Sequence, residues 1–207
     1  MKFIIKKSDI VDVLSKVQGL TGRKSNLAIT ANVLISANDA GITMMATDLE
    51  TGFEGTYPAS KISEGSIAIN SRKLYEIVKD FPSDDINISE VENRWIEIGN
   101  KNIEFHIVGM NPEDFPDIPK IEDISFFNID AEIFKDMIEK SLVISASDDK
   151  RAHIIGIYFE KIEVDKQSLL RMVSTDGSRL STVDYACESE ADFLSGEGII
   201  VPKKGLN

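Results

Sequence analysis

The sequence repeats its own pattern, and this repeat constrains the fold more than any other feature of its 207 residues. In each half, an alternating apolar strand is followed by apolar residues at helical spacing, then by a strand ending in Thr-Asp, then by a further apolar strand. The paired segments are 3–5 and 127–129, 42–48 and 170–176, and 67–72 and 199–204. Their order is kept with small insertions, which indicates internal duplication of one fold.

The boundary between the two halves is marked by proline. Three of the six prolines fall within residues 111–119, a segment typical of a linker or domain edge. We therefore predict a first domain at 1–120 and a second at 121–207. The second domain is expected to be incomplete, because its second helix would only begin near Asn207.

Each half predicts an α+β domain, with helices embedded among short antiparallel strands. In the first half we expect helices at 8–18 and 71–81, the second of them capped by Ser71. The expected strands that follow are 86–90, 94–99 and 102–107.

The charge pattern argues against binding of nucleic acid by bulk attraction. There are 23 basic and 35 acidic residues, for a net charge of −12. Residues 1–24 nevertheless carry six basic groups against two acidic ones, whereas residues 82–126 carry three against eleven. Such polarity allows one cationic surface on an acidic protein, although a solvated polar face is the commoner cause of charge clusters.

The composition gives little support for a metal site, a disulfide or a membrane span. Cys187 has no partner for an internal disulfide, and with His106 and His153 it cannot complete a usual zinc or iron site. We expect no cofactor and no metal, with an acidic-residue site formally open. Neither a membrane span nor a signal sequence is recognised, so a cytoplasmic location is expected.

One pair of carboxylates could be catalytic, but their positions in the sequence favour a structural role. Asp48 and Asp176 occupy matching positions just after strands, where an aspartate commonly bonds the backbone of a turn. Nothing next to either residue in the sequence would shift its pKa. His106 is expected to be an ordinary solvent-facing residue. No catalytic residue is predicted.

The turn around Asp176 and Gly177 is more informative. Asp-Gly between alternating stretches predicts a tight hairpin, yet the first half has Asp48-Leu49 at the same place. A glycine is therefore not required by the hairpin alone, and we expect the second half to need bare backbone there. Two interpretations remain open at this point: half of a peptide-binding cleft, or a plain hairpin whose Leu180 packs inward.

The sequence resembles the bacterial β sliding clamp family, the DNA polymerase III beta subunit that serves as processivity factor of the replicative polymerase. Five motifs in family order carry the resemblance, and they span the whole chain. They are Met1-Lys2-Phe3, Ala46-Thr47-Asp48-Leu49-Glu50, Asp114-Phe115-Pro116, Thr175-Asp176-Gly177-x-Arg179-Leu180 and Ile200-Val201-Pro202-Lys203-Lys204-Gly205.

The resemblance implies a non-enzymatic bacterial protein that works in DNA replication. Each subunit of the family has three domains of one fold, and two subunits join head to tail in a homodimer ring. The helices line a hole around double-stranded DNA and the antiparallel sheets lie outside. The implied partners are DNA, the replicative polymerase, the clamp loader and repair proteins, bound through short peptide motifs. The third domain is expected to be absent from this chain.

The resemblance also implies three groups of site residues. The expected DNA-binding residues are Lys24, Arg72, Lys79, Arg151, Lys203 and Lys204. The expected peptide-binding residues are Ile154, Thr175, Gly177, Ser178, Arg179 and Leu180. The expected ring interface comprises Leu74, Phe105 and Ile107, the last two on an alternating apolar strand suited to an exposed sheet edge.

Two rival functions are kept beside this one. The first is a generic acidic α+β interaction module unrelated to replication, which would ignore the topology of DNA. The second is an enzyme that uses Asp48 or Asp176 and would lose turnover when Asp48 is replaced by Asn.

Overall fold

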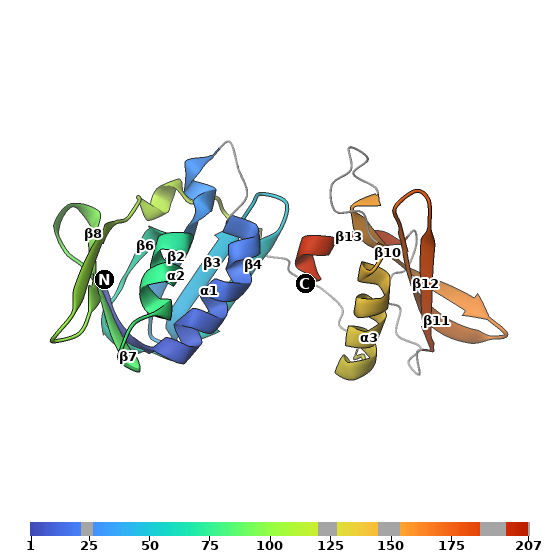
Figure 1. The fold of residues 1–207 in the computed structure, drawn as a ribbon, viewed down its shortest axis with the longest axis horizontal. Helices are drawn as coiled ribbons and strands as arrows, with labels where there is room; N and C mark the ends of the chain where they lie inside the picture. The colour runs from blue at the N-terminus through green and yellow to red at the C-terminus, as the bar shows by residue number, and fades with distance from the viewer. Residues whose placement is uncertain (22–26, 120–127, 145–153, 187–197, 207) are drawn as a thin grey trace. The chain divides into compact units, whose positions relative to one another are not determined.

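The computed structural model describes residues 1–21, 27–119, 128–144, 154–186 and 198–206. They belong to two compact units, Met1–Pro119 and Lys120–Asn207, which are described separately below (Figure 1). Among the described residues, no helix is both long enough and apolar enough to cross a membrane.

Unit 1 contains two antiparallel sheets. The first, sheet A, has the order β5-β1-β7-β8-β9 and is made of Ser60–Ser63 (β5), Lys2–Lys6 (β1), Asp85–Glu90 (β7), Trp95–Gly99 (β8) and Glu104–Val108 (β9). The second, sheet B, has the order β4-β3-β2-β6 and is made of Gly52–Tyr57 (β4), Gly41–Thr47 (β3), Asn32–Asn38 (β2) and Gly65–Asn70 (β6). The predicted strands of sheet A are confirmed within two residues at each end.

Two helices, α1 (Lys7–Thr21) and α2 (Ser71–Lys79), pack against each other and against sheet B (Figure 1). One apolar core joins the helices to both sheets, because each element turns its apolar face inward. Burial of a large apolar side chain stabilises the fold by about 2 kcal/mol. The largest fully buried side chains include Phe3, Ile10, Leu14, Met44 and Phe81.

The start of α2 differs from the prediction in a small but physical way. The cap is Asn70, whose side chain accepts a hydrogen bond from the backbone N–H of Lys73. Ser71 is fully buried and its hydroxyl accepts a hydrogen bond from Gln18 Nε2 at 2.9 Å. The predicted cap at Ser71 is therefore wrong by one residue, because that hydroxyl ties α2 to α1 instead.

Unit 2 has one helix and one antiparallel sheet among its described residues. Helix α3 (Ala131–Leu142) is capped by Asp130, which accepts from two backbone N–H groups, and packs on β11 and β12. Sheet C has the order β12-β11-β10-β13, made of Leu180–Ala186 (β12), Gln167–Thr175 (β11), Gly156–Val164 (β10) and Ile199–Pro202 (β13).

Sheets B and C share one connectivity. In each, the first two strands in sequence form the centre, the third lies outside the second, and the fourth returns to pair with the first. Strands β3 and β11 end in the matching Thr-Asp motif, and β6 and β13 are the matching apolar strands. This agreement confirms the internal duplication and the α+β fold class.

The proline-rich segment is attached to unit 1. A 3₁₀ helix, η3 (Pro112–Asp114), delivers Phe115 into a small apolar cluster with Ile29 and Ala68. Met110 exchanges backbone hydrogen bonds with Ala68 just before it. The segment is therefore packed along unit 1, up to its end at Pro119.

Candidate functional site

The first candidate surface is an apolar groove at the edge of sheet A. Strand β9 pairs with β8 on one side only and ends the strand order of the sheet. The groove has a volume of about 650 Å³ and lies between β9 and the end of α2. It is lined by Lys73, Glu76, Ile77, Asp80, Phe81, Pro82, Ile103, Phe105 and Ile107.

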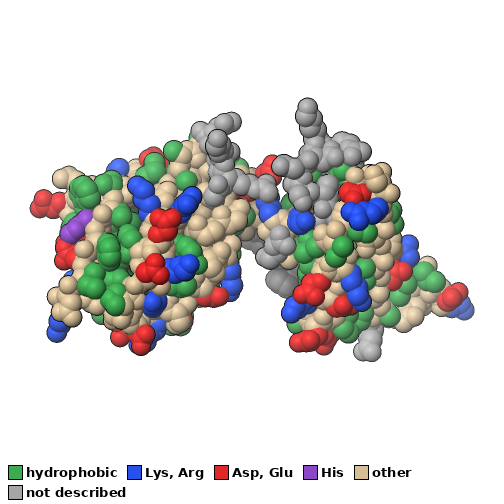
Figure 2. Space-filling model, in the orientation of Figure 1, with side chains coloured by type: hydrophobic (Ala, Val, Ile, Leu, Met, Phe, Trp, Pro, Cys, Tyr) green, Lys and Arg blue, Asp and Glu red, His purple; other side chains and the backbone are tan. Residues whose placement is uncertain are grey.

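Two phenyl rings form one wall of this groove. Phe81 is anchored in the core with 1% exposed, and its ring lies 6.4 Å from the ring of Phe105, which is 41% exposed. Ile107 is half-buried and packs against the core. Figure 2 shows hydrophobic side chains gathered beside the histidine drawn in purple. An unpaired strand edge next to half-exposed apolar side chains has the character of a docking surface.

Leu74 does not belong to this surface. It faces the core of unit 1 and has 0% of its area exposed, so its side chain has nothing to offer a partner. Its prediction as a contact residue is therefore corrected: Leu74 holds α2 in place, and the polar residues of the groove rim come from neighbouring turns of that helix. Sequence reasoning missed these rim residues, Lys73, Glu76 and Asp80.

The second candidate surface is the hairpin turn between β11 and β12. Asp176 Oδ1 accepts hydrogen bonds from the backbone N–H groups of Ser178 and Arg179, both at 2.9 Å. The Thr175 hydroxyl donates to the carbonyl of Arg179 at 2.6 Å and accepts from the N–H of Gly177 at 3.0 Å. The turn is thus built from its own side chains.

The first unit builds the same turn. Asp48 Oδ1 accepts from the N–H groups of Glu50 and Thr51, and the Thr47 hydroxyl donates to Thr51 and accepts from Leu49. Leu49 has a φ of 76°, in the left-handed region that Gly177 occupies at 87°. Both turns therefore adopt this conformation, which gives Gly177 a local reason to be glycine, and the need for bare backbone toward a partner stays a prediction.

The side chains around the second turn are nonetheless accessible. Leu180 is 62% exposed, so the alternative in which it packs inward is wrong. Arg179 is held by an ion pair with Asp176 at 3.0 Å while its side chain stays 67% exposed. Thr175 is half-buried and Ile154 is buried at 6% exposed. The predicted peptide-binding residues thus divide into an exposed group at 177–180 and two less exposed residues, Thr175 and Ile154.

Both aspartates have a structural role in their turns. Asp48 and Asp176 both accept the N–H groups that follow them in the turn, which is the structural role expected from the sequence. These turn hydrogen bonds and the Arg179 guanidinium lower the pKa of Asp176 below its ordinary value, so it stays ionised at neutral pH. The sequence had shown no neighbour capable of shifting that pKa, and this expectation is corrected.

The predicted DNA-binding residues are basic side chains divided between the two units. Arg72 is 78% exposed and pairs with Glu76 at 3.0 Å on the same face of α2, and the Lys79 ammonium lies 5.9 Å from the ring centre of Tyr75. Lys203 and Lys204 are half-buried in η5 (Lys203–Gly205). Lys24 and Arg151, also predicted to contact DNA, lie outside the described residues.

Two protein-family models match the chain. Residues 1–119 match the family model of the DNA polymerase III beta subunit N-terminal domain, and residues 128–207 match its central domain. The Beta sliding clamp of Treponema pallidum is 30% identical over 208 residues, covering 100% of this chain and 54% of that protein.

Two solved structures are similar over the whole chain. The sliding clamp of Bartonella birtlesii bound to griselimycin is 27% identical with a TM-score of 0.88, and Caulobacter crescentus pol III beta is 27% identical with a TM-score of 0.87. In both, the match covers 100% of this chain and 55% of the other. The chain thus spans about half the length of these relatives.

The duplicated α+β units define a class of tandem-domain α+β protein, and the first unit carries an apolar edge groove. Within that class, the chain belongs to the DNA polymerase III beta subunit family. The resemblance found in its motifs is thereby confirmed.

Proposed function

We propose that this chain is part of a sliding clamp, a DNA polymerase processivity factor that encircles duplex DNA and tethers the replicative polymerase and other partners. The observation that carries the proposal is the succession of two units of one fold, matched in order by the N-terminal and central domains of the family. We propose no catalysis for it; it acts as an accessory subunit in the bacterial cytoplasm.

The charge of the chain suits binding by topology. A ring that surrounds DNA needs no tight contacts, and strong attraction to phosphates would slow its movement along the duplex. A protein with a net charge of −12 and a few exposed cations meets this requirement. We assign DNA contact to Arg72, Lys79, Lys203 and Lys204, with Lys24 and Arg151 as further members.

The groove beside β9 is the proposed ring interface. Phe105 and Ile107 project from an edge strand with free backbone groups on one side, so a strand of a second subunit would extend sheet A and cover the apolar groove. The charged rim from α2 would set the orientation of that partner. In this proposal the complete subunit has a third domain and two subunits form the ring.

The turn between β11 and β12 is the proposed rim of a cleft for short peptide segments of the polymerase, the clamp loader and repair proteins. Leu180 supplies exposed apolar area and Arg179 supplies a positive charge beside it. The Bartonella relative, which is bound to griselimycin, supports the presence of a ligand site in clamps of this family.

The proposal is tested by comparing retention of the protein on circular and on linear duplex DNA. A full-length subunit with these residues should stay on circular duplex DNA after loading and be lost when the circle is cut, because a ring slides off an end. Replacing Arg72 and Lys79 together by Glu should lower retention. The matched control places the same charge change at two exposed lysines elsewhere in unit 1, Lys2 on β1 and Lys101 in the turn between β8 and β9. Equal retention on circular and linear DNA would contradict the proposal and favour a groove-binding module.

A further inference from the structure

The outer face of sheet A carries a cluster of side chains that the proposed function does not use. Glu97 on β8 lies directly opposite His106 on β9, and Glu104 lies two residues before His106 on the same strand. Alternation places all three on one face of the sheet, opposite to the face that Phe105 and Ile107 present to the groove. The register of one strand pair therefore brings two carboxylates to one imidazole.

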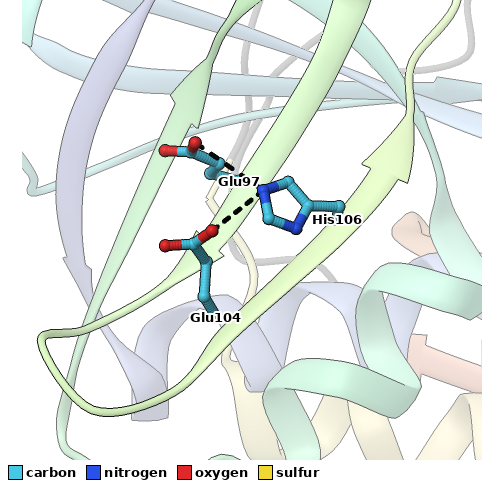
Figure 3. A group of neighbouring side chains, drawn as sticks. All are labelled: Glu97, Glu104 and His106. Carbon is cyan, nitrogen blue, oxygen red and sulfur yellow. Dashed lines mark ion pairs between the residues drawn. The ribbon is translucent and has the colours of Figure 1, made fainter.

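The atoms of this cluster are close enough to share one ligand. His106 Nε2 lies 2.9 Å from Glu104 Oε1 and 3.6 Å from Glu97 Oε1 (Figure 3). One ligand atom from each residue lies within 4.8 Å of the other two. In a tetrahedral zinc site the ligand atoms lie about 2.1 Å from the metal, and thus roughly 3.4 Å from one another. The observed distances bracket this value.

A residue outside the cluster orients one of its carboxylates. The Ser89 hydroxyl, on the neighbouring strand β7, donates a hydrogen bond to Glu97 Oε2 at 3.4 Å. Glu97 Oε1 is then left facing the imidazole, as Figure 3 shows. An outer hydrogen bond that fixes a ligating carboxylate is a regular component of metal sites in proteins.

The chemistry of the three groups selects the kind of ion. Mg²⁺ and Ca²⁺ prefer oxygen ligands alone, whereas an imidazole with two carboxylates suits a transition ion such as Zn²⁺. The three side chains are between 37% and 55% exposed, so water can reach the remaining coordination position. We propose that Glu97, Glu104 and His106 form a surface site for a divalent transition-metal ion, which would link β8 to the edge strand β9.

The proposal is tested by titrating the 207-residue protein with Zn²⁺ in an isothermal calorimeter and with Co²⁺ in an absorption spectrometer. We expect one ion to bind per chain at saturation. Bound Co²⁺ should give the visible absorption of a low-symmetry site. Zn²⁺ should raise the unfolding temperature, since the ion binds the folded state. The replacement His106→Ala should abolish all three effects. Glu97→Gln, Glu104→Gln and Ser89→Ala should each weaken binding by about tenfold.

The other histidine and the single cysteine of the chain provide the matched control. A variant with both His153→Ala and Cys187→Ser should bind Zn²⁺ as the parent protein does. If the parent shows no saturable binding at millimolar Zn²⁺, or if His106→Ala binds as tightly as the parent while the double control variant does not, the assignment is overturned. Circular dichroism of His106→Ala guards against loss of fold, and Glu104→Gln on the exposed hairpin provides an independent second variant.

Discussion

Leu49 and Gly177 occupy the same position in two equivalent turns, and both hold a left-handed backbone, with φ of 76° and 87°. The same threonine hydroxyl and aspartate carboxylate bonds surround each residue. A leucine is strained in this conformation and a glycine is not, because the leucine Cβ crowds the following carbonyl. One half of the duplication therefore stores strain that the other half lacks.

This difference predicts opposite effects of two substitutions. Leu49→Gly should raise the free energy of unfolding by about 1 kcal/mol, since it relieves the strain and the leucine side chain is mostly exposed. Gly177→Ala should lower it by about 1 kcal/mol. Urea denaturation followed by circular dichroism measures both. A destabilised Leu49→Gly protein would show that the leucine side chain matters more than its backbone.

Under the proposed function, the groove beside β9 is the face of the edge strand that closes the ring. In a full-length subunit, Phe105→Asp should shift the dimer toward monomer, because it places a charge in an apolar contact. Val108→Asp is the control, since that residue is 58% exposed on the opposite face of the same strand. Sedimentation velocity distinguishes them. Ile107→Asp should also dissociate the dimer, but its contact with the core adds a loss of stability. An unchanged dimer in Phe105→Asp would remove the groove from the interface.

The second turn predicts where a partner peptide binds. Leu180→Asp in the full-length clamp should weaken binding of a labelled polymerase peptide by roughly tenfold or more, as expected for an apolar anchor of a cleft. Val164→Asp, an exposed apolar position in the same sheet, should leave the affinity unchanged. Fluorescence anisotropy of the labelled peptide measures its affinity for both variants. Substitutions at Gly177 suit this test less well, because their effects on turn geometry would obscure any effect on binding. Wild-type affinity in Leu180→Asp would place the cleft elsewhere.

The pair of Arg171 and Asp184 predicts a loss of stability in acid. Two hydrogen bonds of 2.7 and 2.8 Å join the guanidinium to the carboxylate across β11 and β12, and they lower the pKa of Asp184 below its ordinary 3.8. A lowered folded-state pKa stabilises the fold above about pH 4, and this stability is lost as the pH falls through that pKa.

Asp184→Asn should therefore cost about 0.5 kcal/mol at neutral pH, a small value because both side chains are about one-third exposed. The cost should shrink as the pH falls below 4, as Asp184 becomes protonated in the folded protein. Urea denaturation at several pH values measures the difference between the two proteins. A penalty that persists unchanged in acid would mean that shape, and not charge, holds the pair together.

Much of the fold was determined by the sequence itself. The duplication, the α+β class, the two helices of the first unit and four strands of sheet A (β1, β7, β8 and β9) were predicted, because apolar periodicity and repeated motifs are local properties of the chain. The family followed from the same motifs. The exposed strand face with Phe105 was also predicted, from the alternation of apolar residues together with the family resemblance.

Tertiary structure alone decided which side chains meet. The capping role passed from Ser71 to Asn70 because Gln18, far along the chain, binds the serine hydroxyl. Leu74 proved to be a core residue because α2 packs against α1 and sheet B. The approach of Glu97 to His106 depends on strand register, a long-range property. Periodicity reports which face a residue occupies, but only packing against distant elements decides what that face touches.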